Sequence, residues 1–83
     1  MDKFTIELIV ANHIGVLNRI TGLYLRRGYN IDSLNVNETS DPTLSRMLIV
    51  SKGDEYIRTQ MVRQLSKLHD VIEVTLMARV KEI

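Results

Sequence analysis

Four segments of the chain alternate between apolar and polar residues, a pattern typical of β-strands that bury one face. The alternation predicts strands at about 3–11, 30–38, 44–51 and 71–80. The third segment is apolar on both faces, which predicts a central strand. The core faces of the first and last strands are expected to carry Phe4, Ile6, Leu8 and Val10, and Ile72, Val74, Leu76, Ala78 and Val80.

Two further segments place apolar residues at the spacing of one helical face. They predict helices at about 15–27 and 54–68, with Gly28 ending the first and Asp54 capping the start of the second. The buried stripes are expected to consist of Val16, Ile20, Leu23 and Tyr24 in the first helix, and of Ile57, Met61, Leu65 and Leu68 in the second.

The order of the elements is strand, helix, strand, strand, helix, strand. It predicts an α+β fold, a ferredoxin-like βαββαβ sandwich in which two helices cover one face of a four-stranded antiparallel sheet. The expected strand order is fourth, first, third, second, and residues 1–83 are expected to form one domain. A domain this small buries only about 60% of its unfolded surface, so self-association is a reasonable source of further stability.

The composition excludes several kinds of chemistry. The net charge is +1 and there is no cysteine, which argues against a nucleic-acid surface and rules out disulfides, cysteine–zinc sites and thiol catalysis. His13 and His69 have no partners at metal-ligand spacing and are expected to be solvent-exposed, as are the carboxylates. One phenylalanine cannot supply the aromatic platform of an RNA-binding sheet. We therefore predict no catalytic residue, no metal and no nucleic-acid partner.

The start of the chain and its hydropathy bear on location. Met1-Asp2-Lys3 leads directly into the first strand, so no signal peptide is predicted. No apolar run approaches the ~20 residues that span a bilayer. The expected location is the cytoplasm, without a membrane partner.

The loop between the first strand and the first helix has the features of a small-molecule site. Free amides at a helix N-terminus bind anions, and Gly15 lets a ligand approach the backbone. Asn12 can accept from an ammonium group or donate to a carboxylate, while Ile14, Val16 and Leu17 are apolar. Together they fit a small zwitterion with an aliphatic side chain. The alternative is that Asn12 and Gly15 are only turn residues.

A second candidate surface lies on the first helix, where Asn18, Gly22 and Leu25 face away from the buried stripe. A glycine within a helix costs about 1 kcal/mol relative to alanine, and close approach of a second helix across a two-fold axis would account for it. The second strand is an edge strand with few charges, and such edges are usually paired or covered. The alternative is an ordinary exposed helix face.

Four longer runs of residues can be compared with known families. They are Asn12-x-x-Gly15-Val16-Leu17-x-Arg19-Ile20, Arg27-Gly28-Tyr29-Asn30-Ile31-Asp32-Ser33-Leu34, Asp41-Pro42-Thr43-Leu44-Ser45-Arg46-Met47 and Gln64-Leu65-x-Lys67-Leu68-x-Asp70-Val71. In this order and spacing they resemble the ACT domain of the regulatory (small) subunit of acetolactate synthase, also called acetohydroxyacid synthase. The resemblance covers residues 4–76.

The resemblance implies a non-catalytic subunit. Small subunits of this family bind a large catalytic subunit, raise its activity and make it sensitive to feedback inhibition, typically by valine. Thiamine diphosphate, Mg and FAD are expected only in the large subunit, and no cofactor is expected in this chain. Arg46 and Met47 are expected either to contact the large subunit from the open sheet face or to serve packing and a local ion pair.

The resemblance also implies where the effector binds. ACT domains of this family form a homodimer through the second strand and the first helix, and the effector lies at the junction. The expected effector residues are Asn12, His13, Ile14, Gly15, Val16 and Leu17 of one protomer, with Asn30 and Ile31 of the other. The expected dimer interface includes Asn18, Gly22, Leu25, Asn30 and Ile31.

Two alternatives stay open at this point. Many family members carry a second domain of similar length, so the 83 residues are either a naturally short subunit or the first domain of a longer one. The expected function is regulation of branched-chain amino acid biosynthesis. The other candidates are a stand-alone amino-acid sensor with a different partner and an enzyme in its own right.

Overall fold

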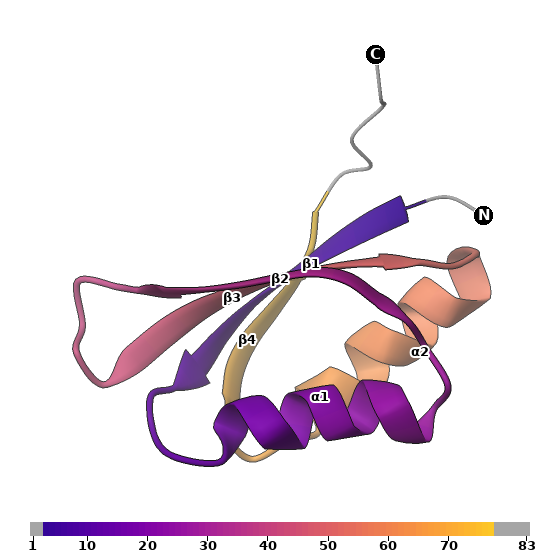
Figure 1. Ribbon diagram of the computed structural model, residues 1–83. Coiled ribbons are helices and arrows are strands. Elements are labelled where there is room, and N and C mark those ends of the chain that lie inside the picture. The colour runs from indigo at the N-terminus through magenta and orange to yellow at the C-terminus, as the bar shows by residue number, and fades with distance from the viewer. Residues whose placement is uncertain (1–2, 78–83) are drawn as a thin grey trace.

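The computed structural model describes residues 3–77, which form two layers, a sheet and a pair of helices (Figure 1). In chain order the elements are β1 (Lys3–Ala11), α1 (Val16–Arg26), β2 (Ile31–Glu38), β3 (Leu44–Lys52), α2 (Glu55–Ser66) and β4 (Val71–Leu76). The predicted fold is confirmed, and the bounds of the first five elements agree with the prediction within two residues. The predicted strand residues Ala78 and Val80 lie outside the described residues.

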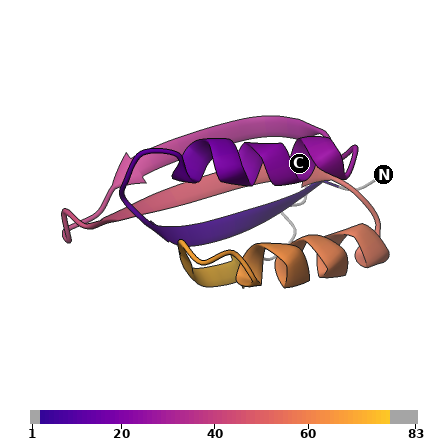
Figure 2. The same ribbon diagram turned by 90° about the horizontal axis from the view of Figure 1, so that it is seen from below.

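The sheet is antiparallel with the strand order β2-β3-β1-β4, as predicted. β1 and β3 are the inner strands and pair along their whole length, from Lys3 opposite Lys52 to Ala11 opposite Leu44. Both helices cover the same face of the sheet, α1 along the β2 side and α2 along the β4 side (Figures 1 and 2). Residues 3–77 leave the opposite face of the sheet open.

One hydrophobic core lies between the sheet and the helices. The alternating faces of the inner strands meet the predicted stripes of both helices there, so these predictions are confirmed. Ile57, Leu68, Val71 and Val74 are partly buried and pack against this core. The buried core residues are Phe4, Ile6, Leu8, Val10, Val16, Ile20, Leu23, Tyr24, Met47, Ile49, Met61 and Leu65.

The predicted helix signals are also confirmed. Asp54 caps α2, because its Oδ1 accepts a hydrogen bond from the amide of Ile57 at 2.9 Å. Gly28 follows α1 with φ +69°, and its amide donates to the carbonyl of Leu25 at 3.0 Å. A left-handed glycine in this position satisfies the last carbonyls of a helix and turns the chain toward the next strand.

The buried face of β4 differs from the prediction. The pairing of β1 with β4 shifts register between Ile9 and Val10. This β-bulge leaves Ile72 as an extra residue, and 62% of its surface is exposed. Val71 and Val74 pack against the core instead. The prediction of a buried Ile72 was wrong, because a bulge changes the phase of a strand without changing its hydrophobic pattern.

One further side chain, Leu76, departs from its expected surroundings, whereas Met47 and Arg46 agree with the alternative of packing and a local ion pair. Leu76 pairs with Ile6 on the helix side of the sheet, but the edge position leaves it 43% exposed. Met47 is 1% exposed and belongs to the core, so it serves packing and cannot contact a partner. Arg46 lies on the open face, where its Nε is 3.5 Å from Oε2 of Glu7.

Candidate functional site

The β1–α1 loop, residues 12–15, ends in a backbone conformation suited to glycine. Gly15 is the N-cap residue of α1 and has φ +94°, a region that residues with side chains rarely adopt. Among residues 3–77, no side chain caps this helix, and its first turn holds no acidic residue. The amide of Val16 donates to the carbonyl of His13, but those of Leu17 and Asn18 are open to solvent or a ligand, and the positive end of the helix dipole favours an anion there.

Asn12, at the start of this loop, is fixed by the β2–β3 turn. Its amide donates to the carbonyl of Thr43 at 2.8 Å, and its Nδ2 donates to the carbonyl of Pro42 at 3.2 Å. Asp41 holds that turn, because its carboxylate accepts hydrogen bonds from the hydroxyl and the amide of Thr43. Both bonds lower the pKa of Asp41, the hydroxyl bond more than the amide bond. The side-chain oxygen of Asn12 remains as the group that can accept from a ligand.

The apolar residues around the loop differ in exposure. Ile14 is 100% exposed and Leu17 is 44% exposed, so both present apolar surface beside the helix start. Val16 is buried in the core, and its amide makes only a long contact of 3.4 Å with the carbonyl of His13. A ligand at this loop could therefore touch the side chains of Ile14 and Leu17 but only the backbone of Val16.

A buried carboxylate lies behind the loop, and the sequence analysis missed it. Asp70 is 5% exposed; its Oδ1 accepts a hydrogen bond from Nε2 of His13 at 2.8 Å, and its Oδ2 pairs with the guanidinium of Arg19. His13 is exposed, as predicted, although it has this partner, whereas the expectation that the carboxylates are solvated was wrong at Asp70. The partners are 57 and 51 residues from Asp70 in sequence, so no local pattern relates them.

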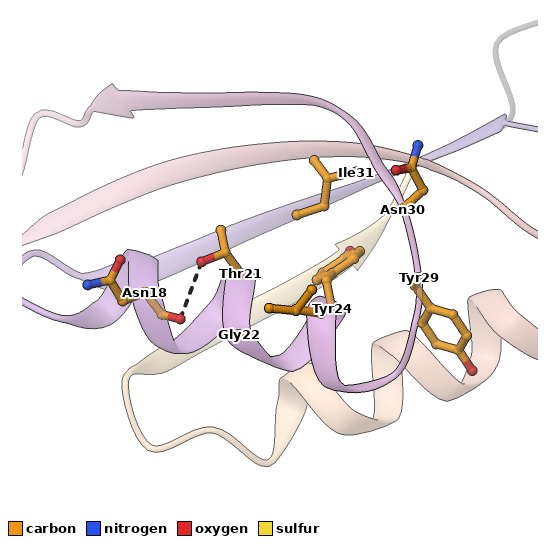
Figure 3. A pocket seen from close by; sticks show the side chains of 8 residues that line it. Asn18, Thr21, Gly22, Tyr24, Tyr29, Asn30 and Ile31 are labelled. Atoms are coloured by element: carbon orange, nitrogen blue, oxygen red, sulfur yellow. Dashed lines mark hydrogen bonds between the residues drawn. The ribbon is translucent and has the colours of Figure 1, made fainter.

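The second candidate surface is an open groove of about 530 Å³ beside α1 and the start of β2 (Figure 3). All five residues expected at the dimer interface line it. A Cβ at Gly22 would meet only the guanidinium of Arg26, at 3.5 Å, so packing within the chain does not require this glycine. Leu25 is 80% exposed. The groove is lined by Asn18, Thr21, Gly22, Tyr24, Leu25, Tyr29, Asn30 and Ile31.

Tyr24 lines the same groove from the core. Burial raises the pKa of Tyr24 to about 12, and the Ser51 hydroxyl is close enough to offset part of that rise. The two hydroxyls do not meet in hydrogen-bond geometry, and neither has another partner among the described residues. A buried hydroxyl without a partner costs about 1–3 kcal/mol. The neutral phenol of Tyr24 therefore lowers the stability of the core at a position that lines the groove.

One chain does not bring all the expected effector residues together. Residues 12–17 lie at the start of α1, whereas Asn30 and Ile31 follow its end, and the 11 residues of the helix span about 16 Å. The Nδ2 of Asn30 donates to Oδ1 of Asp32 at 2.7 Å, which leaves the Asn30 side-chain oxygen as an acceptor. The two groups could share a ligand only across an interface between two chains.

Other kinds of site were sought over the same part of the chain. Within residues 3–77, no group of three His, Asp or Glu side chains could hold a metal ion. No helix in this range is long and apolar enough to cross a membrane. His69 is exposed, as predicted.

Known proteins match most of the chain. The family described as the AHAS small subunit-like ACT domain matches residues 6–73. The chain is 49% identical over 70 residues to the acetolactate synthase isozyme 3 small subunit of Escherichia coli (strain K12). This match covers 84% of this chain and 43% of that protein. It is 48% identical over 73 residues to the probable acetolactate synthase small subunit of Archaeoglobus fulgidus, covering 88% of this chain and 46% of that protein.

A solved structure agrees with these sequence matches. The crystal structure of the acetolactate synthase small subunit from Thermotoga maritima superimposes with a TM-score of 0.85 at 37% identity, over 92% of this chain and 47% of that one. The chain therefore spans somewhat less than half the length of each of these three relatives.

Proposed function

The chain belongs to the family of AHAS small subunit-like ACT domains, and from this premise we propose that it is the effector-binding domain of an acetolactate synthase small subunit. It binds a branched-chain amino acid, with valine the first candidate, and so activates and feedback-inhibits a large catalytic subunit in the cytoplasm. Catalysis and the cofactors thiamine diphosphate, Mg and FAD belong to that subunit. The observation that carries the proposal is 49% identity to a small subunit over 84% of the chain.

The complete effector site forms between two copies of the chain in this proposal. In a two-fold contact, a residue at a given distance before the axis faces the residue at the same distance after it on the partner. Gly15 stands seven residues before Gly22 and Tyr29 seven after; Ile14 stands eight before and Asn30 eight after. Antiparallel packing of two α1 helices at Gly22 therefore brings the β1–α1 loop toward the partner's Asn30.

The groups at that junction suit the two ends of an α-amino acid. The effector carboxylate binds the open amides of the first turn of α1. The ammonium group donates to the side-chain oxygens of Asn12 and of the partner's Asn30, both of which are left free by the bonds described above. The aliphatic side chain packs against Ile14 and Leu17, which are exposed in the isolated chain.

The large subunit has a separate surface available on the open face of the sheet. Ile9, Leu48 and Val50 form a half-exposed apolar strip on the inner strands there. Both helices lie on the opposite face (Figure 2), and the groove is lined mainly by residues of α1. An apolar strip with polar surroundings fits a protein partner, and its position allows effector binding and subunit contact to be altered separately.

The test is to mix the chain with a purified acetolactate synthase large subunit and to measure acetolactate formation with and without valine. Stimulation that valine reverses supports the proposal. Valine binding without stimulation would support the alternative, a stand-alone amino-acid sensor with another partner. Turnover by this chain alone would overturn both.

Direct binding provides an independent measurement. A ligand at a hundredfold excess over its Kd stabilises the folded protein by about 2.7 kcal/mol, a large effect for a domain of this size. Valine should therefore raise the Tm clearly. No shift with valine, leucine or isoleucine would exclude the branched-chain assignment, and a monomer by light scattering at micromolar concentration would exclude the shared site.

A further inference from the structure

Asp70 contacts three separate segments of the fold. It stands between α2 and β4, and its carbonyl accepts a hydrogen bond from the amide of Ala11 at the end of β1, at 2.8 Å. Its Oδ1 binds His13 within the β1–α1 loop, and its Oδ2 binds Arg19 on α1. The two side-chain partners lie on either side of Gly15, so one carboxylate braces the loop both before and after its glycine.

The burial of this carboxylate shows that the contacts are specific. Asp70 is 5% exposed, whereas the side chains of His13 and Arg19 are 53% and 50% exposed. Removing a carboxylate from water costs several kcal/mol unless both oxygens are paired and hydrogen-bonded. Each oxygen of Asp70 has one such partner. The buried carboxylate therefore fixes the positions of the exposed side chains of His13 and Arg19.

Apart from Asp70 and the anchor at Asn12, the loop is held by short-range hydrogen bonds, three between backbone groups and one from the ring of His13 to the neighbouring carbonyl of Ile14. No heavy atom of residues 3–77, beyond the immediate chain neighbours, lies within 4 Å of the Cβ position of Gly15, and Ile14 is fully exposed. Asn12 is anchored to the β2–β3 turn, which fixes only the first residue of the loop. Amides can bind a carboxylate without an ordering cost only if they are already oriented.

We propose that Asp70 is a positioning residue of the effector site. Through His13 it holds the β1–α1 loop in the conformation that presents the open amides of α1, without touching the ligand itself. The inference rests on the proposed function for the identity of the ligand, but the bracing of the loop is a property of the free protein and can be measured without any ligand.

The test is a double-mutant cycle on the full chain, with Asp70→Asn, His13→Ala and both together. Glu73→Gln is the matched control, because it removes an exposed carboxylate from neighbouring β4. By calorimetry, Asp70→Asn should raise the Kd for valine about tenfold, a usual size for residues that share a contact. The double variant should not lose more valine affinity than His13→Ala alone. Glu73→Gln should bind valine as the wild type does.

A merely structural role predicts different results. If Asp70 only stabilises the fold, the losses of valine affinity caused by Asp70→Asn and by His13→Ala will add as free energies in the double variant. This outcome overturns the proposal. Unchanged valine binding in Asp70→Asn overturns it as well. His13→Ala keeps the pair between Asp70 and Arg19, so this variant tests the loop contact even if Asp70→Asn fails to fold.

A readout without ligand separates this inference from the proposed function. If the wild type binds none of the three branched-chain amino acids, the proposed function fails. The backbone dynamics of the loop in the free protein then test the role of Asp70. The steady-state ¹⁵N NOE of residues 13–15 should fall in Asp70→Asn and His13→Ala relative to the wild type and Glu73→Gln. Equal values in all the variants would overturn the proposal.

Discussion

The two halves of this fold have the same order of elements, strand, helix, strand, but begin their helices in opposite ways. In the second half, α2 starts with a side-chain cap from Asp54 and an acidic residue, Glu55, in its first turn. In the first half, α1 starts at Gly15, and the described residues provide neither a side-chain cap nor an acidic residue in the first turn. One helix start is satisfied by its own sequence, and the other is left for a ligand or water.

The same division extends beyond the helix starts. Gly53, before α2, is packed so closely that a Cβ would lie 2.7 Å from Ile57, whereas Gly15 and Gly22 face open space or a single flexible side chain. The two unpartnered buried hydroxyls do not follow this division, because Tyr24 belongs to the first half and Ser51, on β3, to the second. The contrast between the halves therefore lies in their helix starts and in the space around their glycines, and the first half keeps the open helix start that a ligand can satisfy.

The largest expected effect is on effector binding, from a pair of substitutions at the open helix start. Asparagine tolerates a positive φ better than most residues, so Gly15→Asn measures bulk and strain. Gly15→Asp is nearly the same size but adds a carboxylate that can occupy the α1 amides and repel the effector. We expect Gly15→Asp to bind valine at least about tenfold more weakly than Gly15→Asn.

The reconstituted enzyme gives the corresponding functional measurement. Gly15→Asp should still stimulate the large subunit while losing valine inhibition, because a site that does not bind cannot couple. Equal valine inhibition in Gly15→Asp and the wild type would show that the effector does not bind at the open start of α1, and the contrast between the two helices would then have no functional meaning.

The largest expected loss of stability comes from the second half. In Gly53→Ala the new Cβ would lie 2.7 and 2.9 Å from two atoms of Ile57 and 3.1 Å from the ring of Phe4. Overpacking of this kind lowers the free energy of unfolding by about 1–3 kcal/mol, and contacts this short place Gly53→Ala toward the upper end. Urea denaturation at one fixed protein concentration measures the change. The Kd for valine should stay the same, and an unchanged midpoint would contradict the packing argument.

A different division, between local and distant contacts, explains what the sequence could predict. Alternation and helical spacing located β1, β3 and the buried stripes of both helices, because these elements bury one regular face against the core. Asp54 and Gly28 were predictable because a cap acts on residues only a few positions away. Gly15 was predictable as a special position, since glycine before a helical pattern is itself a local signal.

The parts that sequence reasoning missed depend on distant contacts. Ile72 is exposed because β4 meets β1 with a bulge, which is a property of two strands together. Asp70 looked like a solvated residue after a helix, and only the folded chain brings it to His13 and Arg19. The candidate effector residues were named from resemblance as two groups on different protomers, and the structure places the two groups at opposite ends of α1.

A third prediction concerns the buried phenol of the first half at alkaline pH. Unfolded tyrosine ionises near pH 10, whereas burial holds the proton of folded Tyr24 to about pH 12. Between these values the unfolded chain binds fewer protons, so the free energy of unfolding falls as pH rises, by roughly 3 kcal/mol in total. Tyr24→Phe should remove this part of the decline and leave stability at pH 7 nearly unchanged or higher.

Tyr56→Phe is the matched control for this measurement, because Tyr56 is 68% exposed on α2. Unfolding curves at several pH values between 9 and about 12 should show the same decline in this variant as in the wild type. A decline of equal size in Tyr24→Phe would mean that the phenol beneath the groove does not control alkaline stability.

The smallest expected effect comes from removing the cap that distinguishes α2 from α1. Asp54→Ala removes the 2.9 Å bond to the amide of Ile57 and should lower the free energy of unfolding by about 1 kcal/mol. Asp54→Ser keeps a capping oxygen without the charge, so it should recover most of that loss if the hydrogen bond matters more than the helix dipole. If serine is as destabilising as alanine, the dipole interaction dominates at α2. The same dipole at the uncapped start of α1 would then be a stronger attraction for the effector carboxylate than the amide hydrogen bonds themselves.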